Sequence, residues 1–132
     1  MKKTSKREDC LFCNIANKNI SSNIIYENET TLAFLDINQS HIGHTLVIPK
    51  QHVCNLLNAN QKQITEVFKA VKKVSNYYLN CGFTGIKVMI ANGQSSGQTV
   101  FHLHVHIFPC GIKYDKKIST KQILEMLKIK ER

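Results

Sequence analysis

The sequence contains no hydrophobic run long enough to cross a membrane. A membrane-spanning helix needs about 20 mostly apolar residues, and no apolar stretch in these 132 residues approaches that length. The basic start, residues 1–7, leads into no apolar segment, so the pattern of a secretory signal is missing as well. The composition therefore argues against an integral membrane protein and against a membrane partner.

The chain also lacks internal repeats, a linker and an even number of cysteines. Its five cysteines include one Cys-x-x-Cys pair, Cys10 and Cys13, which predicts free or metal-bound thiols in a reducing cytoplasm rather than a disulfide framework. A chain of 132 residues without a linker is one domain with room for a hydrophobic core. We expect a basic tail over residues 1–9, the domain over 10–110, and a C-terminal extension with a short helix over 111–132 that belongs to the same domain.

Acidic residues are scarce: 9 Asp and Glu stand against 18 Lys and Arg, for a formal net charge of +9. Such an excess favours anionic ligands, either nucleic acid or phosphate-bearing metabolites. The positive charge gathers at the two ends of the chain, however, and is not interleaved with aromatic residues. It therefore predicts solvated tails and no specific recognition of nucleic acid.

What the sequence does contain is the patterning of an α+β protein. Strands are expected over residues 23–27, 30–35, 45–48 and 85–91, with a short helical turn at 10–16. A long helix is expected over 58–80, and its apolar positions recur at helical spacing: Ile64, Val67, Phe68, Val71, Val74 and Tyr78. Runs of strands around one long helix predict an α+β fold with a mostly antiparallel sheet.

Helix ends are marked by capping patterns. Asn58 with Gln61 resembles a capping box at the start of the long helix, and Gly82 supplies its stop. Ser119 with Gln122 forms a second such pattern, which predicts the short terminal helix.

The most informative stretch is residues 99–109. His102, His104 and His106 alternate with Leu103, Val105 and Ile107, and a period of two is the mark of a strand with two distinct faces. Neighbouring histidines on one face lie roughly 6.6 Å apart, from about 3.3 Å of rise per residue. That spacing suits imidazoles that flank a phosphate or converge on a metal. The plain alternative is an edge strand whose polar face happens to be histidine.

This stretch, with Gly97-Gln98-Thr99-Val100 before it, resembles the signature of the histidine triad (HIT) family, His-x-His-x-His preceded by Gly-Gln-(Ser/Thr)-Val. The resemblance extends from Cys10 to about Pro109. It is closest to the nucleotide-binding, Hint-like branch, and it is related to the diadenosine polyphosphate hydrolases. It implies a HIT-like fold, a mostly antiparallel five-stranded sheet with one long helix and short terminal helices, and it implies a homodimer.

The resemblance implies a catalytic role for three histidines. A neutral imidazole is a good nucleophile toward phosphorus, and histidine is largely neutral at pH 7. His104 matches the family nucleophile, which attacks an α-phosphate to form a nucleotidyl-histidine. His106 would bind the phosphate oxygens, and His44 matches a histidine that supports the triad from a neighbouring strand. The alternative for His44 is an ordinary residue at a strand start.

The resemblance also implies the nucleotide contacts. Asp36 matches a carboxylate that accepts hydrogen bonds from the ribose hydroxyls. Four residues match the apolar pocket for the base: Phe12, Ile15, Phe34 and Ile37. For Ile15 and Phe34, packing in the core is an equally good explanation. The loop Gly97, Gln98 and Thr99 is the candidate phosphate cradle, through backbone N–H groups, a hydroxyl and an amide. Where the family usually has Asn or Gln this chain has Ala91, so either the adjacent Asn92 substitutes or a contact is lost.

A second constellation consists of Cys10, Cys13, His52 and His102. Two thiolates and two imidazoles form a tetrahedral ligand set for zinc, and four protein ligands make such a site structural rather than catalytic. Both histidines match ligands in zinc-bearing members of the family and in its galactose-1-phosphate uridylyltransferase relatives. A Cys-x-x-Cys pair alone could instead be a redox motif.

The leading interpretation is a purine nucleotide-binding hydrolase. It would cleave nucleoside 5′-phosphoramidates or related α-phosphate bonds and release AMP through a nucleotidyl-histidine intermediate. The alternatives are a dinucleoside polyphosphate hydrolase, a zinc hydrolase or hydratase that uses the histidine row as metal ligands, and a nucleotide sensor with weak hydrolysis. The sequence does not choose a physiological substrate among them.

Overall fold

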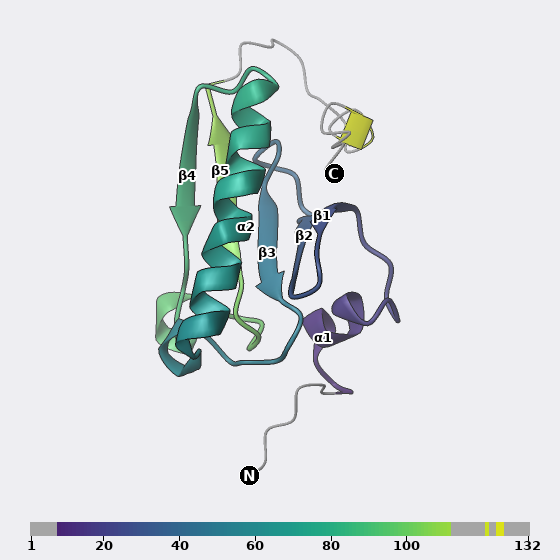
Figure 1. The fold of residues 1–132 in the computed structure, drawn as a ribbon, viewed down its shortest axis with the longest axis vertical. Coiled ribbons are helices and arrows are strands. Elements are labelled where there is room, and N and C mark those ends of the chain that lie inside the picture. Colours follow the sequence, from purple (N-terminus) through teal and green to yellow (C-terminus); the bar gives the residue numbers. More distant parts are fainter. Residues whose placement is uncertain (1–7, 112–120, 122–123, 126–132) are drawn as a thin grey trace.

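The computed structural model describes residues 8–111, 121 and 124–125. Its helices and strands follow the predicted order, and the chain has the α+β fold that its patterning predicts (Figure 1). In chain order they are α1 (Leu11–Ala16), β1 (Ile24–Glu27), β2 (Thr31–Leu35), β3 (Thr45–Pro49), the 3₁₀ turn η1 (Leu56–Asn58), α2 (Gln61–Asn80), β4 (Gly85–Met89), the 3₁₀ turn η2 (Gln94–Ser96) and β5 (Val105–Cys110).

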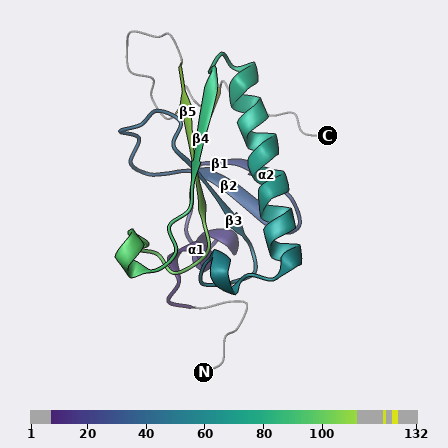
Figure 2. The ribbon, with the colours of Figure 1, turned by 90° about the vertical axis from the view of Figure 1, so that its left-hand side faces the viewer.

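The five strands form one antiparallel sheet in the order β1-β2-β3-β5-β4. β2 and β3 are buried at every position because a helix covers each face there. Helix α2 packs on one face, against Ala33, Val47 and Ile107 among others, whereas α1 packs on the opposite face, against Phe34 and Leu46. Figure 2 shows α2 on one side of the sheet and η2 on the other.

The N-cap of helix α2 is Asn60, two residues later than the Asn58 that the sequence pattern suggests. The capping box is Asn60 with Gln63, whose side chains accept reciprocally from each other's backbone N–H groups. Both pairs fit the Asn-x-x-Gln pattern, but Asn58 ends the 3₁₀ turn η1, whose first residues are capped by the Asn55 side chain, and Ala59 is extended. The Asn92 side-chain oxygen accepts from Leu56 N–H at 2.9 Å, and the residues around it form η1 instead of helix.

The apolar face of α2 is close to the predicted one. Val67, Val71, Val74 and Tyr78 are buried in the core as expected. Phe68 is not, since 37% of it is exposed. Adjacent helical positions point about 100° apart, so Phe68 lies at the margin of the face that Val67 centres.

The histidine stretch is a regular strand only from Val105 onward, so the prediction of a strand from His102 is wrong at its start. Leu103 N–H donates to the Val53 carbonyl at 2.7 Å instead of joining the ladder. The predicted apolar row is nevertheless confirmed, because Leu103, Val105 and Ile107 all lie in the core beneath α2. β4 likewise ends at Met89, before the predicted Ala91.

Two sequence expectations concern the end of the chain and the membrane. The capping pattern of Ser119 and Gln122 lies outside the described residues. Among the residues that are described, no helix combines the length and the apolar character that a membrane crossing requires.

Candidate active site

The histidines occupy the sheet face that carries α1. His106 lies on β5 directly between Leu46 of β3 and Met89 of β4, and His104 immediately precedes the strand. His44 immediately precedes β3, and its carbonyl accepts from Asp36 N–H at 2.9 Å. Two segments far apart in the sequence, residues 104–106 and residue 44, therefore deliver histidine side chains to one region of one face.

His104 is held in one tautomer by the backbone. Its Nδ1–H donates to the His102 carbonyl at 2.8 Å, so the lone pair of the ring is on Nε2. The side chain is 8% exposed, and the Phe12 ring packs edge-on at 5.0 Å between centroids. Burial lowers the pKa of His104 below its usual value. At neutral pH His104 is therefore an uncharged imidazole with Nε2 available as a nucleophile.

His106 and His44 form a hydrogen-bonded pair. His106 Nδ1 lies 2.9 Å from His44 Nε2, and His44 Nδ1 lies 3.6 Å from an Asp36 carboxylate oxygen. Burial, helped by the neighbouring histidines, lowers the pKa of His106 to about 4. Burial also lowers the pKa of His44, although the Asp36 charge opposes that shift. A neutral His106 can donate through Nε2 to a bound anion only when its Nδ1 accepts from His44.

An apolar cavity of about 340 Å³ adjoins the histidines, because Phe12, which lines it, packs on His104, and Leu46, which also lines it, is paired with His106. Its lining includes all five residues predicted to contact the nucleoside: Phe12, Ile15, Phe34, Asp36 and Ile37. Phe12 and Phe34 are buried and meet edge-to-face at 5.5 Å, whereas Ile37 is 98% exposed. The cavity thus combines apolar walls with a single carboxylate, and it has the chemistry to hold a flat ring with a hydroxylated sugar.

The loop before the histidines is braced by Gln98. This side chain is 2% exposed, and its amide donates to the carbonyls of Cys54 and Val100 at 2.8 and 3.0 Å. Its oxygen accepts from Gly93 N–H at 2.8 Å. In this conformation Gln98 shapes the loop and its amide is not available to a phosphate. Thr99 is exposed, and the Asn92 oxygen is already engaged with Leu56 N–H.

Cys10, Cys13, His52 and His102 come together at the N-terminus of α1. Their ligand atoms all lie within 4.8 Å of one another, and no other such group of three or more occurs in the part of the chain that the structure describes. The Cys13 sulfur lies 3.3 Å from His52 Nδ1 and 3.5 Å from His102 Nδ1. His102 Nε2 donates to the Pro49 carbonyl at 2.8 Å, which leaves its Nδ1 facing the thiols. The cluster could hold a metal ion.

A HIT domain family model matches residues 17–111. The chain belongs to the histidine triad family. An uncharacterized HIT-like protein of Borreliella burgdorferi is 42% identical over 132 residues, with 93% of this chain and 92% of that protein covered. A hypothetical histidine triad nucleotide-binding protein from Sulfolobus tokodaii superposes with a TM-score of 0.78 at 35% identity, covering 90% and 87% of the two chains. A HIT family hydrolase from Clostridium thermocellum superposes at 0.72 with 34% identity, covering 86% and 100%.

Two residues of this histidine triad site were not predicted from the sequence. The Phe108 ring stacks on His44 at 4.3 Å and 20°, and His44 also stacks on His106 at 5.2 Å and 23°. Phe108 could have been found, because it continues the alternation that places His106 on this face. Leu46, which lines the cavity, could not, since its place beside His106 depends on strand register.

Proposed function

We propose that this histidine triad protein is a purine nucleotide-binding hydrolase. It cleaves nucleoside 5′-phosphoramidates or related bonds at the α-phosphate and releases AMP. The observation that carries the proposal is the state of His104. Its Nδ1–H donates to the His102 carbonyl, so its Nε2 bears the lone pair. Phe12, which lines the nucleoside cavity, packs against the His104 ring. A nucleotide in that cavity brings its first phosphorus next to His104.

The proposed reaction has two displacement steps. In the first, His104 Nε2 bonds to phosphorus while the bond to the leaving nitrogen or oxygen breaks. The leaving group takes the electron pair, and a leaving amine also takes one proton from solvent. In the second, a water oxygen bonds to phosphorus while the nitrogen–phosphorus bond breaks, and one water proton is released. The sum is hydrolysis with no net proton consumed. His106, backed by His44 at 2.9 Å, binds the phosphate oxygens.

The test is direct capture of the intermediate. The wild-type protein is mixed with adenosine 5′-phosphoramidate, quenched during turnover, and digested for peptide mass spectrometry. The expected result is an adenylyl group on His104, and loss of turnover by about a thousandfold or more in His104→Ala. An adduct on another residue, or full activity of His104→Ala, overturns the assignment.

We further propose that the Cys/His cluster binds zinc in a structural role. A tetrahedral zinc ion with ligand distances of about 2.3 Å to sulfur and 2.0–2.1 Å to nitrogen separates sulfur from nitrogen by about 3.6 Å. The observed separations of 3.3 and 3.5 Å already approach that value, so the residues fit the ion. Four protein ligands leave no coordination position for a substrate. As one of these ligands, His102 would not be available to react with a phosphate.

The alternative substrates share the same α-phosphate. A dinucleoside polyphosphate hydrolase and a nucleotide sensor with weak hydrolysis would use the same cavity and the same His104. Parallel assays with adenosine 5′-phosphoramidate and diadenosine tetraphosphate distinguish a phosphoramidate hydrolase from a dinucleoside polyphosphate hydrolase. Slow turnover of both substrates together with tight AMP binding identifies a sensor. A homodimer and a cytoplasmic location stay predictions of the family resemblance and of the cysteine pattern.

A further inference from the structure

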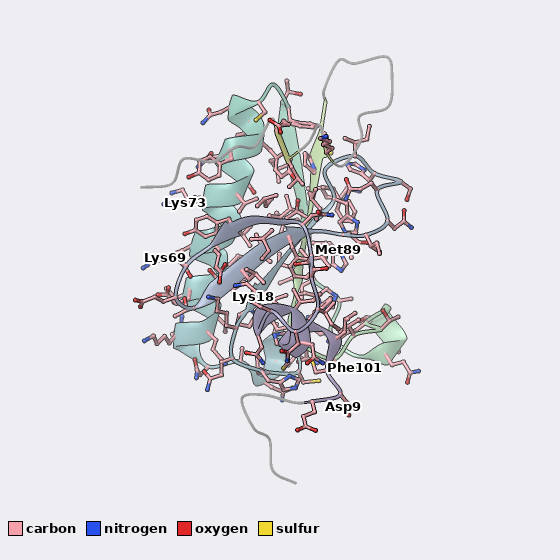
Figure 3. The ribbon with its side chains drawn as sticks, turned by 90° about the vertical axis from the view of Figure 1, so that its right-hand side faces the viewer. Asp9, Lys18, Lys69, Lys73, Met89 and Phe101 are labelled. Atoms are coloured by element: carbon pink, nitrogen blue, oxygen red, sulfur yellow. The ribbon has the colours of Figure 1, made fainter. Side chains whose placement is uncertain are left out.

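The loop between β2 and β3 carries one residue of the candidate site at each of its ends. Asp36 follows β2, His44 precedes β3, and the His44 carbonyl accepts from Asp36 N–H at 2.9 Å. The Gln39 amide bridges the same two ends, because it donates to both of their carbonyls at 2.8 and 2.9 Å. The loop lies on the side of the sheet away from Lys69 and Lys73 of α2 (Figure 3). These bonds fix the backbone at the base of the loop, but they do not set the direction of the His44 ring.

His41 fastens this loop to β5. Its Nε2–H donates to the Pro109 carbonyl at 2.6 Å, across 68 positions of sequence. Its own carbonyl accepts from His44 N–H at 3.0 Å and closes the four-residue turn that leads into β3. His41 therefore ties the turn that carries His44 to the strand that carries His106.

His41 also contacts the ring that stacks on His44. Its imidazole meets the Phe108 ring edge-on, at 5.2 Å between centroids and 76° between planes. Phe108 in turn stacks on His44 at 4.3 Å and lies parallel to His106 at 5.9 Å. Aromatic rings in contact prefer a few relative orientations, so each ring limits the rotation of its neighbour. His41 thus acts on the His44 ring by two routes, the backbone turn and the Phe108 ring.

The orientation of the His44 ring decides whether His106 can bind a phosphate. A neutral imidazole has one N–H, so His106 offers its Nε2–H to an anion only while its Nδ1 accepts from His44 Nε2–H. The distance of 2.9 Å between those two nitrogens requires the His44 ring to keep both its position and its rotation. If the His44 ring turned away, His106 Nδ1 would lose this donor and the proton of His106 would distribute over both of its nitrogens.

We propose that His41 is a positioning residue for the reaction: it keeps the His44 ring turned toward His106, and it thereby keeps the His106 N–H directed at the phosphate. This inference rests on the proposed function and extends it to a histidine outside the triad, which does not line the nucleoside cavity. Because other bonds tie Asp36 to the base of the loop, loss of the His41 side chain should spare the nucleoside contacts and slow the step at phosphorus.

The experiment separates the hydrogen-bond donor of His41 from a general loss of stability. His41→Leu removes the donor, whereas His41→Gln keeps an Nε2 donor in a side-chain amide. His41→Asn, whose amide is one bond shorter, is a second variant that loses the bond to Pro109. Val74→Ala, in the core on the opposite face of the sheet, is the control for lost stability alone. Each variant is checked by a melting curve and assayed with adenosine 5′-phosphoramidate.

The expected result is that His41→Leu and His41→Asn lower kcat about tenfold, the size of one hydrogen bond, and leave KM nearly unchanged, while His41→Gln regains most of the rate. In ¹⁵N NMR spectra of the imidazole rings, wild type and His41→Gln should carry the His106 proton on Nε2. His41→Leu should show His106 nitrogen shifts averaged over both tautomers. Val74→Ala should melt at a lower temperature with kcat and the His106 tautomer unchanged.

Wild-type kcat and an unchanged His106 tautomer in the Leu and Asn variants of His41 would overturn the inference while the proposed function stands. An equal loss of rate in His41→Gln, or the same loss in Val74→Ala, would overturn it as well, because the effect would then not depend on the donor. Absence of turnover in the wild type would overturn the proposed function. The NMR spectra need no turnover, so they would still decide whether His41 orients the histidine pair.

Discussion

At the scale of the residue, His102 links the two halves of the candidate site. Its Nδ1 faces the thiols of Cys10 and Cys13, its Nε2 donates to the Pro49 carbonyl, and its own carbonyl accepts from His104 Nδ1. A residue of the Cys/His cluster thus also selects the tautomer of the proposed nucleophile. A disturbance of the cluster is expected to reach the chemistry through this one backbone carbonyl.

Asp36 carries a prediction about the sugar. Asp36→Ala should weaken AMP binding by about 1–3 kcal/mol, the contribution of a charge-assisted hydrogen bond. The affected ligands should be those with a ribose diol, so 2′,3′-dideoxy-AMP should lose much less affinity. Titration calorimetry with both nucleotides measures the difference.

The control for this prediction is Asp36→Asn. One Asp36 carboxylate oxygen accepts from Asn38 N–H at 2.8 Å. The side-chain amide introduced by the control substitution keeps an acceptor oxygen for that N–H but carries no charge. It therefore separates the effect of the carboxylate charge on binding from the effect of the loop's shape. If Asp36→Ala weakened the binding of AMP and of 2′,3′-dideoxy-AMP equally, Asp36 would act only by shaping its loop or by contacting His44.

His106 carries a prediction about pH. Its pKa is about 4 in the folded protein and about 6.5 in an unfolded chain, so between these values the unfolded state binds more protons. The contribution of a neutral His106 to the free energy of unfolding is therefore fully present above pH 6.5, and it is lost as the pH falls toward 4. Asp36, His44 and His104 are the titratable groups that face it, and only the Asp36 charge opposes the shift.

Melting temperatures of wild type and His106→Gln over pH 4 to 7 test this. The wild type should lose stability on acidification more steeply than the variant, which has no group to protonate at this position. Parallel curves for the two proteins would mean that His106 does not contribute to the acid sensitivity.

At the scale of the element, Gly43 determines how β3 begins. It has φ +85°, and a Cβ atom there would lie 2.9 Å from Pro109 Cγ and 3.3 Å from Tyr78 Cε1. The turn is further tied by Thr45, whose hydroxyl donates to the Gly43 carbonyl at 2.7 Å and bonds Tyr78 at 2.7 Å. His44 follows Gly43 directly. The turn, which requires glycine, therefore also orients the His44 side chain, the hydrogen-bond partner of His106.

Gly43→Ala should lower the free energy of unfolding by about 2 kcal/mol or more, because the left-handed backbone and the crowding add. Gly85→Ala is the matched control, since nothing lies within 4 Å of its added methyl group and its φ is not in the left-handed region. Denaturant titration of both variants measures the two losses. A similar small loss in both would mean that the turn can relax around the methyl group.

At the scale of the whole molecule, two clusters of apolar residues stabilise the two faces of the sheet. Helix α2 covers the larger cluster on one face, while the six-residue α1 covers the smaller one. So short a helix is not stable alone. The Cys/His cluster joins α1 to His52 and His102, and we expect a bound metal to hold α1 against the sheet and to keep the nucleoside cavity intact.

The corresponding prediction concerns Cys13→Ser. The wild type, purified without chelator, should contain one zinc ion per chain by elemental analysis, and the variant should contain less and melt at a lower temperature, because an assembled metal site contributes folding free energy. The Cys110→Ser variant should keep its zinc, because Cys110 lies at the far end of β5 and is not one of the candidate ligands. Metal-free wild type with an unchanged melting temperature after chelation would contradict the prediction.

The sequence alone predicted the elements and most of the residues that the structure brings together at the candidate site, but not where several elements begin. The start of α2 was misplaced because Asn58–Gln61 and Asn60–Gln63 fit the same local pattern, and in the structure Asn58 ends the 3₁₀ turn η1, which is held by the local Asn55 cap and by the contact of Leu56 with Asn92. The role of Gln98 was also beyond local reasoning. Its amide was expected to face a phosphate, yet it is buried against carbonyls from residues 54 and 100.

By itself the sequence determined which side chains share a face and which residues form each constellation. Alternation is a local property of the strand, so Val105 and Ile107 had to lie opposite His106, and a Cys-x-x-Cys pair sets its own spacing. Only the tertiary structure decided which strands are neighbours. Register joins Phe34, Leu46, His106 and Met89 into one row, and it depends on how two helices of different length bury the two faces of one sheet. That order is a property of the packed core, which no local stretch of sequence contains.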